Sequence, residues 1–183
     1  MASLGSGGPP EVIPSVSSLS IDWEEISDGE LIGQGGNADV YRGTIIRDGE
    51  PLPWLAMEYM DGGSLLDMLS EGRLPFKQAL WVGYCVCQAV HHAHRHGVAH
   101  HDLKPANILF RKYDGCWMVP KVSDWGLARM MLEETGSVDG LSPHYSAPEQ
   151  FDADQYGSPN DQTDIYQAGT LLYELLTGKP PFE

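Results

Sequence analysis

The chain has 183 residues and 42% of them are hydrophobic, which fits one medium-sized globular domain or two small lobes. Its 26 acidic residues outnumber its 11 basic ones, giving a formal net charge of −15. A surface of this charge repels phosphate backbones and anionic lipids, so we expect neither nucleic acid nor a membrane among the partners.

The composition also bears on the cellular compartment. The three cysteines, Cys85, Cys87 and Cys116, are odd in number and include no C-x-x-C pair. No signal peptide opens the sequence and no apolar run is long enough to span a bilayer, so we expect free thiols in a reducing cytoplasm.

Only five residues are lysine. Such an acidic, lysine-poor composition fits either a high-salt cytoplasm, where salt screens the self-repulsion, or an ordinary acidic protein.

The first 60 residues divide into a leader and a glycine-rich segment. Residues 1–20 are rich in Gly, Ser and Pro and show no hydrophobic periodicity, which predicts a flexible leader. Residues 31–43 read L-I-G-Q-G-G-N-A-D-V-Y-R-G and predict a hairpin whose turn glycines let backbone N–H groups approach a phosphate. Short motifs of this kind also occur in hairpins that bind nothing, and that alternative stays open here. The residues concerned are Gly33, Gly35 and Gly36 in the turn, with Ile32 and Val40 as flanking strand residues.

A strand, a turn and three helices are predicted in the rest of the chain. Trp54–Tyr59 is apolar enough for a strand, and Ser64 after the Asp-Gly-Gly turn is a helix N-cap for a helix through residue 70. Apolar residues recur at three-to-four spacing from Phe76 to His96, which indicates a long helix. The last helix begins near Asp161 and ends at the glycine at position 178. A short hairpin is predicted from residues 108–110 and 119–122.

Chemistry-bearing side chains gather between the second and third helices. Asp102, Lys104 and Asn107 stand at short spacings, and Pro105 disfavours helix at the residue before it, so we expect a loop. A carboxylate, an ammonium and a carboxamide that converge in a loop suit a hydroxyl, a phosphate and a metal ion. Further on, Asp124 begins a D-W-G sequence, a second carboxylate followed by a glycine that permits a tight turn.

Four motifs in this region resemble those of one enzyme family. H-H-D-L-K-P-A-N at residues 100–107 resembles the catalytic loop of eukaryotic-type Ser/Thr protein kinases, and D-W-G at residues 124–126 resembles their metal-binding D-F-G. Residues 147–149 are A-P-E, and residues 164–178 resemble the buried helix that anchors the catalytic loop. Because the order and spacing also match, residues 21–183 are identified as a prokaryotic-like member of this family.

The resemblance implies an α+β, protein-kinase-like bilobal fold. Residues 21–60 would form a partial small lobe with the glycine-rich loop and the hinge strand, following the leader of residues 1–20. Residues 61–183 would form a partial, mainly helical large lobe. The β-rich small lobe is expected to be reduced and the large lobe incomplete, since family members continue with further helices.

The resemblance also implies transfer of the γ-phosphoryl group of ATP to a Ser/Thr hydroxyl of a protein substrate. Asp102 would orient the hydroxyl proton and Lys104 would neutralise charge on the transferring phosphate, while Asn107 and Asp124 would hold Mg²⁺. Nothing in the pattern indicates an oligomeric state. The residues expected around the nucleotide are Ile32, Gly33, Gly35, Gly36, Val40, Met57, Glu58, Met60 and Leu109.

One departure from the family pattern concerns activity. No lysine precedes Lys77, so the V-A-I-K lysine, its strand, the regulatory helix and the partner glutamate are absent from the short stretch between Val40 and Trp54. Arg42 shares a strand face with Val40 and is the candidate substitute. Two hypotheses therefore stand: a Ser/Thr kinase of impaired activity, or a non-catalytic pseudokinase-type binding module or remnant of a disrupted kinase gene.

Overall fold

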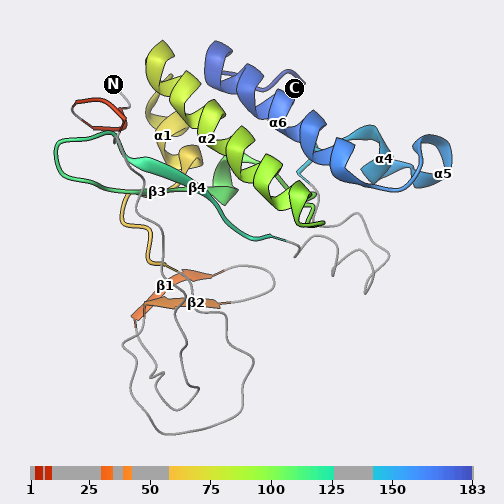
Figure 1. Ribbon diagram of the computed structural model, residues 1–183, viewed down its shortest axis with the longest axis horizontal. Helices are drawn as coiled ribbons and strands as arrows, with labels where there is room; N and C mark the ends of the chain where they lie inside the picture. Colours follow the sequence, from red (N-terminus) through yellow and green to blue (C-terminus); the bar gives the residue numbers. More distant parts are fainter. Residues whose placement is uncertain are drawn as a thin grey trace, which may run out of the picture. The chain divides into compact units, whose positions relative to one another are not determined.

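The chain divides into two compact units in the computed structural model, which describes residues 3–5, 7–9, 30–34, 39–42, 58–125 and 142–182. One unit spans residues 12–59, and the other combines residues 1–11 with residues 60–183. Helices dominate the second unit and each unit carries a two-stranded sheet, so the predicted α+β class is confirmed (Figure 1).

The smaller unit contains the predicted glycine-rich hairpin. Strand β1 (Glu30–Gln34) pairs antiparallel with β2 (Asp39–Arg42), and the register shifts between Leu31 and Gly33. Of the predicted strand Trp54–Tyr59, residues 54–57 lie outside the described part of the chain, and the last two residues have no regular structure.

Three helices of the larger unit begin where the sequence predicts. Helix α1 (Leu65–Glu71) starts after Ser64, whose hydroxyl accepts the backbone N–H of Asp67 while the Asp67 carboxylate accepts the backbone N–H of Ser64. Helix α2 spans Phe76–Arg95 and helix α6 spans Asp161–Thr177. The two long helices lie side by side (Figure 1).

The second hairpin connects the helices to the candidate site. Strand β3 (Ile108–Arg111) pairs antiparallel with β4 (Val119–Val122), as the sequence predicts, directly after a 3₁₀ turn, η2 (Pro105–Asn107). The sequence pattern did not reveal two short helices, α4 (Pro148–Phe151) and α5 (Ala153–Tyr156). They are single turns without the apolar repeat that identifies a longer helix.

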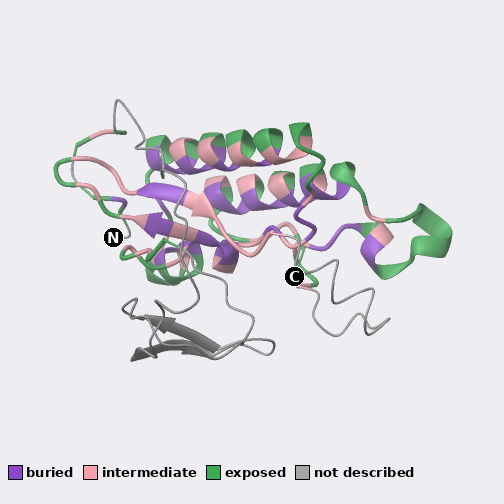
Figure 2. Ribbon diagram, turned by 60° about the horizontal axis from the view of Figure 1, so that its bottom comes forward, coloured by how far each residue is buried: buried purple, intermediate pink, exposed green. Residues whose placement is uncertain are grey.

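The core of the larger unit lies between α2, α6 and the β3–β4 hairpin. The buried residues, purple in Figure 2, lie on the sides of these elements that face one another. Its largest fully buried side chains include Phe110, Leu103 and Leu171. None of the described helices is long and apolar enough to cross a lipid bilayer.

Of the flexible leader predicted for residues 1–20, only residues 3–5 and 7–9 are described, and these pack against the larger unit; the rest lies outside the described part of the chain. The Leu4 side chain is fully buried in the same core, and its backbone is hydrogen-bonded to two distant parts of the chain, at Gln78 and Met118. Composition predicts flexibility from Gly, Ser and Pro, but it does not reveal a single leucine that fits a pocket elsewhere in the fold.

Candidate functional site

A buried carboxylate on α6 fixes the backbone of the loop that contains the candidate catalytic residues. Asp164, fully buried in the first turn of α6, accepts the backbone N–H groups of His100 at 2.8 Å and His101 at 2.7 Å. Its Oδ2 also lies 2.7 Å from Nε2 of His94 at the end of α2. The carboxylate therefore joins both long helices to the loop.

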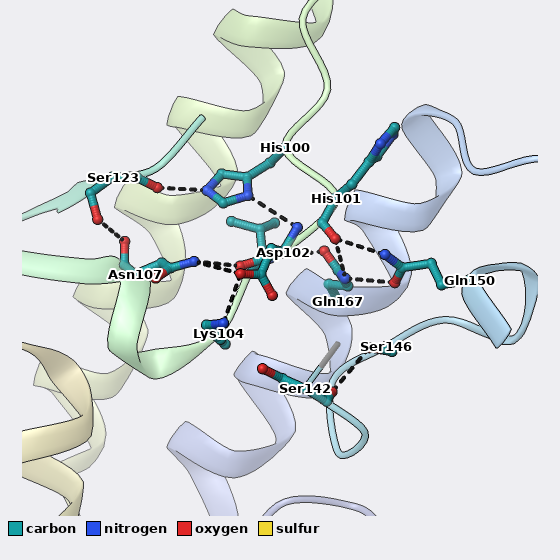
Figure 3. A network of polar contacts seen from close by, with 11 residues as sticks. His100, His101, Asp102, Lys104, Asn107, Ser123, Ser142, Ser146, Gln150 and Gln167 are labelled. Atoms are coloured by element: carbon teal, nitrogen blue, oxygen red, sulfur yellow. Dashed lines mark hydrogen bonds and ion pairs between the residues drawn. The ribbon is translucent and has the colours of Figure 1, made fainter. Parts of the chain in front are cut away.

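Two buried glutamines hold the next residues of the same loop. Gln167 accepts the backbone N–H of Leu103 at 2.9 Å and donates to the carbonyl oxygen of His101 and to Oε1 of Gln150, while Gln150 donates to the same carbonyl at 2.7 Å (Figure 3). His101 has a φ of 65°, a left-handed conformation that costs a non-glycine residue energy. Its Nε2 is buried without a hydrogen-bond partner in the described part of the chain, so the backbone of His101, not its side chain, organises this network.

Asp102, Lys104 and Asn107 come together, as the sequence predicted. The Asp102 carboxylate lies 2.7 Å from Lys104 Nζ and accepts the Asn107 side-chain N–H at 3.1 Å (Figure 3). Asn107 also donates to the backbone oxygen of Asp102 at 2.8 Å. Asp102 and Lys104 side chains are 23% exposed, so a ligand can reach them from solvent while their backbone stays fixed.

His100 links this cluster to the end of strand β4. Its Nδ1 accepts the backbone N–H of Asp102 at 3.1 Å, which leaves the ring proton on Nε2, 2.7 Å from the carbonyl oxygen of Ser123. Burial lowers the pKa of His100 below its usual value, although the Ser123 carbonyl and the nearby carboxylates act in the opposite direction. The neutral ring therefore serves as a fixed spacer between two loops.

Asp124 directly follows Ser123, which is hydrogen-bonded to the backbone of Asn107. The N–H and hydroxyl groups of Ser123 both donate to the backbone oxygen of Asn107, at 2.9 and 3.1 Å. Asp124 follows with a φ of 61°, a second left-handed non-glycine residue. Carboxylate and amide oxygens are ligands that Mg²⁺ accepts in proteins, so the side-chain chemistry of Asp124 and Asn107 fits that ion.

The predicted nucleotide-contacting residues fall in both units and in undescribed stretches. Ile32, Gly33 and Val40 lie in the β1–β2 hairpin. Glu58 and Met60 lie in the segment that leads to α1, and Leu109 in β3 forms a bridge with Ser64. Gly35, Gly36 and Met57 lie outside the described residues, as does most of the segment between D-W-G and A-P-E.

Sequence reasoning missed the polar residues that support the site. Gln167 lies between Asp164 and Leu171 on the buried side of α6, and a polar residue at such a position is a signal that was available. Tyr145 donates its hydroxyl to the buried Glu174 at 2.6 Å, and burial together with that carboxylate raises the pKa of Tyr145. The hydrogen bonds of Gln167 and the one between Tyr145 and Glu174 join residues far apart in the sequence, so residue spacing alone does not reveal them.

Known proteins that resemble this chain are protein kinases. The family model for the protein kinase domain matches residues 50–183. "Serine/threonine-protein kinase PknB" of Mycobacterium leprae is 38% identical over 138 residues, which cover 72% of this chain and 21% of that protein. "Probable serine/threonine-protein kinase CE0033" of Corynebacterium efficiens is 38% identical over 149 residues, covering 77% of this chain and 21% of that protein. The chain thus spans about a fifth of the length of the curated relatives it matches.

Proposed function

Since the chain belongs to the protein kinase domain family, we propose that it is built to transfer the γ-phosphoryl group of ATP to a Ser/Thr hydroxyl of a protein substrate. The observation that carries the proposal is the Asp102 carboxylate, which lies within 2.7 Å of Lys104 Nζ and 3.1 Å of Asn107 Nδ2 on a fixed backbone. The names of the relatives support the choice of Ser/Thr as acceptor.

Each residue of the cluster has a role in this proposal. Asp102 accepts and orients the proton of the substrate hydroxyl, because its carboxylate is partly exposed and its backbone is held by His100. Lys104 neutralises negative charge on the transferring phosphoryl group, as a flexible ammonium can do at this distance from Asp102. Positioning and charge stabilisation account for most of the catalysis of this reaction.

Asn107 and Asp124 are the proposed holders of Mg²⁺. The Asn107 amide N–H groups face Asp102, and the backbone oxygen of Asn107 is bound to Ser123, which leaves the amide oxygen as the candidate ligand. When bound, the ion would offset the negative charge of the nucleotide phosphates. The left-handed backbone at Asp124 is a conformation that aspartate tolerates better than most residues.

The proposed nucleotide site combines backbone and apolar contacts. Glu58 and Met60 would offer backbone groups to the adenine edge, Leu109 would lie under the ring, and Met57 would close the back of the pocket. The glycine-rich turn would approach the phosphates. The proposed residues of that turn and its flanks are Ile32, Gly33, Gly35, Gly36 and Val40.

We further propose that activity is impaired in this form. No lysine precedes Lys77, so the site lacks the cation that holds the α- and β-phosphates in line. Because the reaction depends on positioning, this loss should raise the activation free energy by roughly several kcal/mol. The same absence supports the second candidate function, a non-catalytic module that binds nucleotide or protein. The three free cysteines support a reducing cytoplasm as the location.

Nucleotide titration and phosphoryl transfer, both measured with and without Mg²⁺, test these proposals. We expect weak, Mg²⁺-dependent ATP binding and little phosphorylation of protein acceptors by the unmodified chain. Inserting a lysine-bearing strand and its glutamate-bearing helix between Arg42 and Trp54 should restore transfer, and Asp102→Asn should then reduce the rate by about 10³-fold or more. Asp114→Asn, at an exposed carboxylate in the β3–β4 connection, is the matched control and should leave the rate unchanged.

Three results would contradict these proposals. Transfer at an ordinary kinase rate by the unmodified chain, abolished by Asp102→Asn, would show that the chain is not impaired. A repaired chain that binds ATP and Mg²⁺ but never transfers phosphate would favour the binding module. Transfer that survives Asp102→Asn in the repaired chain would remove Asp102 from its proposed role.

A further inference from the structure

Leu4 fills a pocket in the larger unit of the fold. Its side chain is fully buried and belongs to the same apolar cluster as Leu74, Val82 and Phe110. In Figure 1 the N-terminal segment lies beside the connection between β3 and β4, which agrees with the hydrogen bonds described next. A leucine from the beginning of the chain thus completes a core made by residues 65–175.

Polar groups of the pocket rim pair with the backbone of the same segment. The Leu4 N–H donates to Oε1 of Gln78 at 3.1 Å, and the Met118 N–H donates to the Leu4 carbonyl oxygen at 2.8 Å. The Trp117 N–H donates to the carbonyl oxygen of Gly8 at 2.7 Å. With the segment in place Gln78 is only 7% exposed, and the Leu4 N–H is the hydrogen-bond partner of its amide oxygen in this nearly buried position.

The glycines of the segment fit the rim closely. Gly5 has a φ of +113° and Gly7 a φ of +86°, both in the region that other residues rarely adopt. A Cβ atom at Gly7 would overlap the carbonyl oxygen of Gly115, and one at Gly5 would lie 3.2 Å from the carbonyl oxygen of Cys116. At Gly8, by contrast, a Cβ atom would meet nothing within 4 Å. The rim therefore discriminates between adjacent glycines.

We propose that residues 115–118, Gln78 and the pocket around Leu4 form a peptide-binding groove, and that its resident ligand is the chain's own N-terminal segment, at residues 3–5 and 7–9. The groove recognises a leucine whose backbone N–H and carbonyl oxygen both bind the rim, with glycine one and three positions after it. Occupancy braces the β3–β4 connection and keeps water from the pocket. The proposal is independent of phosphoryl transfer.

Amide hydrogen exchange in the full chain tests the groove. Trp117 and Met118 should exchange slowly in the unmodified chain, because their N–H groups bind the segment. Gly7→Ala should accelerate both amides by about tenfold or more, since it adds a clash and a strained φ. Gly8→Ala, one position along, should leave both protected, while amides in α6 report that each variant is folded.

A free peptide of residues 1–10 tests whether the groove is a binding site. Added to the Gly7→Ala chain, the unmodified peptide should restore protection at Trp117 and Met118, and the same peptide with Gly7→Ala should not. Failure of the unmodified peptide at millimolar concentration would overturn the proposal, as would equal effects of Gly7→Ala and Gly8→Ala.

Two further outcomes are decisive. If Gly7→Ala unfolds the whole domain, the unmodified chain decides: Trp117 and Met118 amides that exchange at the unprotected rate would overturn the proposal, and slow exchange unaffected by excess free peptide carrying Gly7→Ala would support it. Protection that increases with chain concentration, together with a dimer in sedimentation, would show that a second copy is the occupant and would contradict the intramolecular assignment.

Discussion

Asp102 and Asp164 are both aspartates in contact with the same loop, yet the structure gives them different tasks. Asp164 is fully buried and accepts three hydrogen bonds, whereas the Asp102 side chain is 23% exposed and faces Lys104 and Asn107. We therefore predict that Asp164→Asn lowers the free energy of unfolding by about 2–4 kcal/mol, because one buried N–H loses its acceptor. Asp102→Asn should cost less than about 1 kcal/mol, since its ion pair is partly solvated.

Urea unfolding of the two variants and the unmodified chain provides the measurement. The comparison is matched, because both substitutions replace one oxygen of a carboxylate with an NH₂ group and remove the negative charge. Equal losses of stability at the two positions would contradict the assignment of Asp164 to architecture and Asp102 to chemistry.

His100 supplies a prediction about pH. Burial lowers its pKa in the folded chain below the usual 6.5, so between the folded and unfolded pKa values the unfolded chain binds more protons. The contribution to stability is therefore complete above pH 6.5 and is lost as the pH falls through the folded pKa. Protonation would also remove the Nδ1 acceptor of the Asp102 N–H, so acid should loosen the loop around Asp102.

Nitrogen-detected NMR of the imidazole checks both parts of this prediction. We expect a single Nε2–H tautomer at pH 7.5 and a titration midpoint below 6.5, with denaturant stability that decreases from pH 7 towards pH 5.5. A midpoint at or above 6.5 for His100 would contradict the expected direction.

Helix α6 depends on its first turn for more than its own stability. Asn160 caps the helix by accepting the Gln162 N–H at 2.8 Å, and Thr163 accepts the Asn160 N–H and donates to Glu149 at 2.6 Å. Because the same turn contains Asp164, loss of the cap should reach the catalytic loop. We predict that Asn160→Ala costs about 1 kcal/mol and that Asn160→Asp, which keeps an acceptor at the positive end of the helix dipole, stays within about 0.5 kcal/mol of the original.

Hydrogen exchange at Thr163 and Asp164 and at the loop residues His100 and His101 measures the effect of the cap. Faster exchange in α6 alone, with the loop amides unchanged, would show that the first turn and the loop are not coupled. Equal destabilisation by alanine and aspartate would show that the side-chain acceptor at position 160 is unimportant.

The elements that sequence predicted well are those specified by neighbouring residues. The capping residue Ser64, the apolar repeat of α2 and the glycine at position 178 act over a few positions, so the bounds of the helices follow from local chemistry. The clustering of Asp102, Lys104 and Asn107 also follows, since the first and the last are only five positions apart in the sequence.

Long-range fits were not predictable from the same information. The contact between Gln150 and Gln167 spans 17 residues, and the Leu4–Gln78 hydrogen bond spans 74. Each depends on the shape of a pocket that exists only after the helices have packed. The composition of residues 1–20 predicted a flexible leader because low hydrophobicity is an average, whereas the placement of Leu4 is decided by one side chain.

The charge of the whole molecule leads to the last prediction. With a formal net charge of −15 on 183 residues, folding brings like charges together, and the resulting repulsion weakens as salt shortens the screening length from about 10 Å at 0.1 M to about 3 Å at 1 M. We expect the melting temperature to rise by roughly several degrees between 0.02 and 0.5 M NaCl and then to level off.

Sodium sulfate at equal ionic strength should give the same initial rise if screening is the cause. If salting-out is the cause, sodium sulfate should give a larger rise that continues at higher concentration. Replacing exposed acids by lysine, as in Glu71→Lys with Asp114→Lys, should raise the low-salt melting temperature and flatten its dependence on salt. A melting temperature independent of salt in the unmodified chain would mean that its acidic side chains are too dispersed to destabilise the fold, and would remove the physical basis for expecting a high-salt cytoplasm.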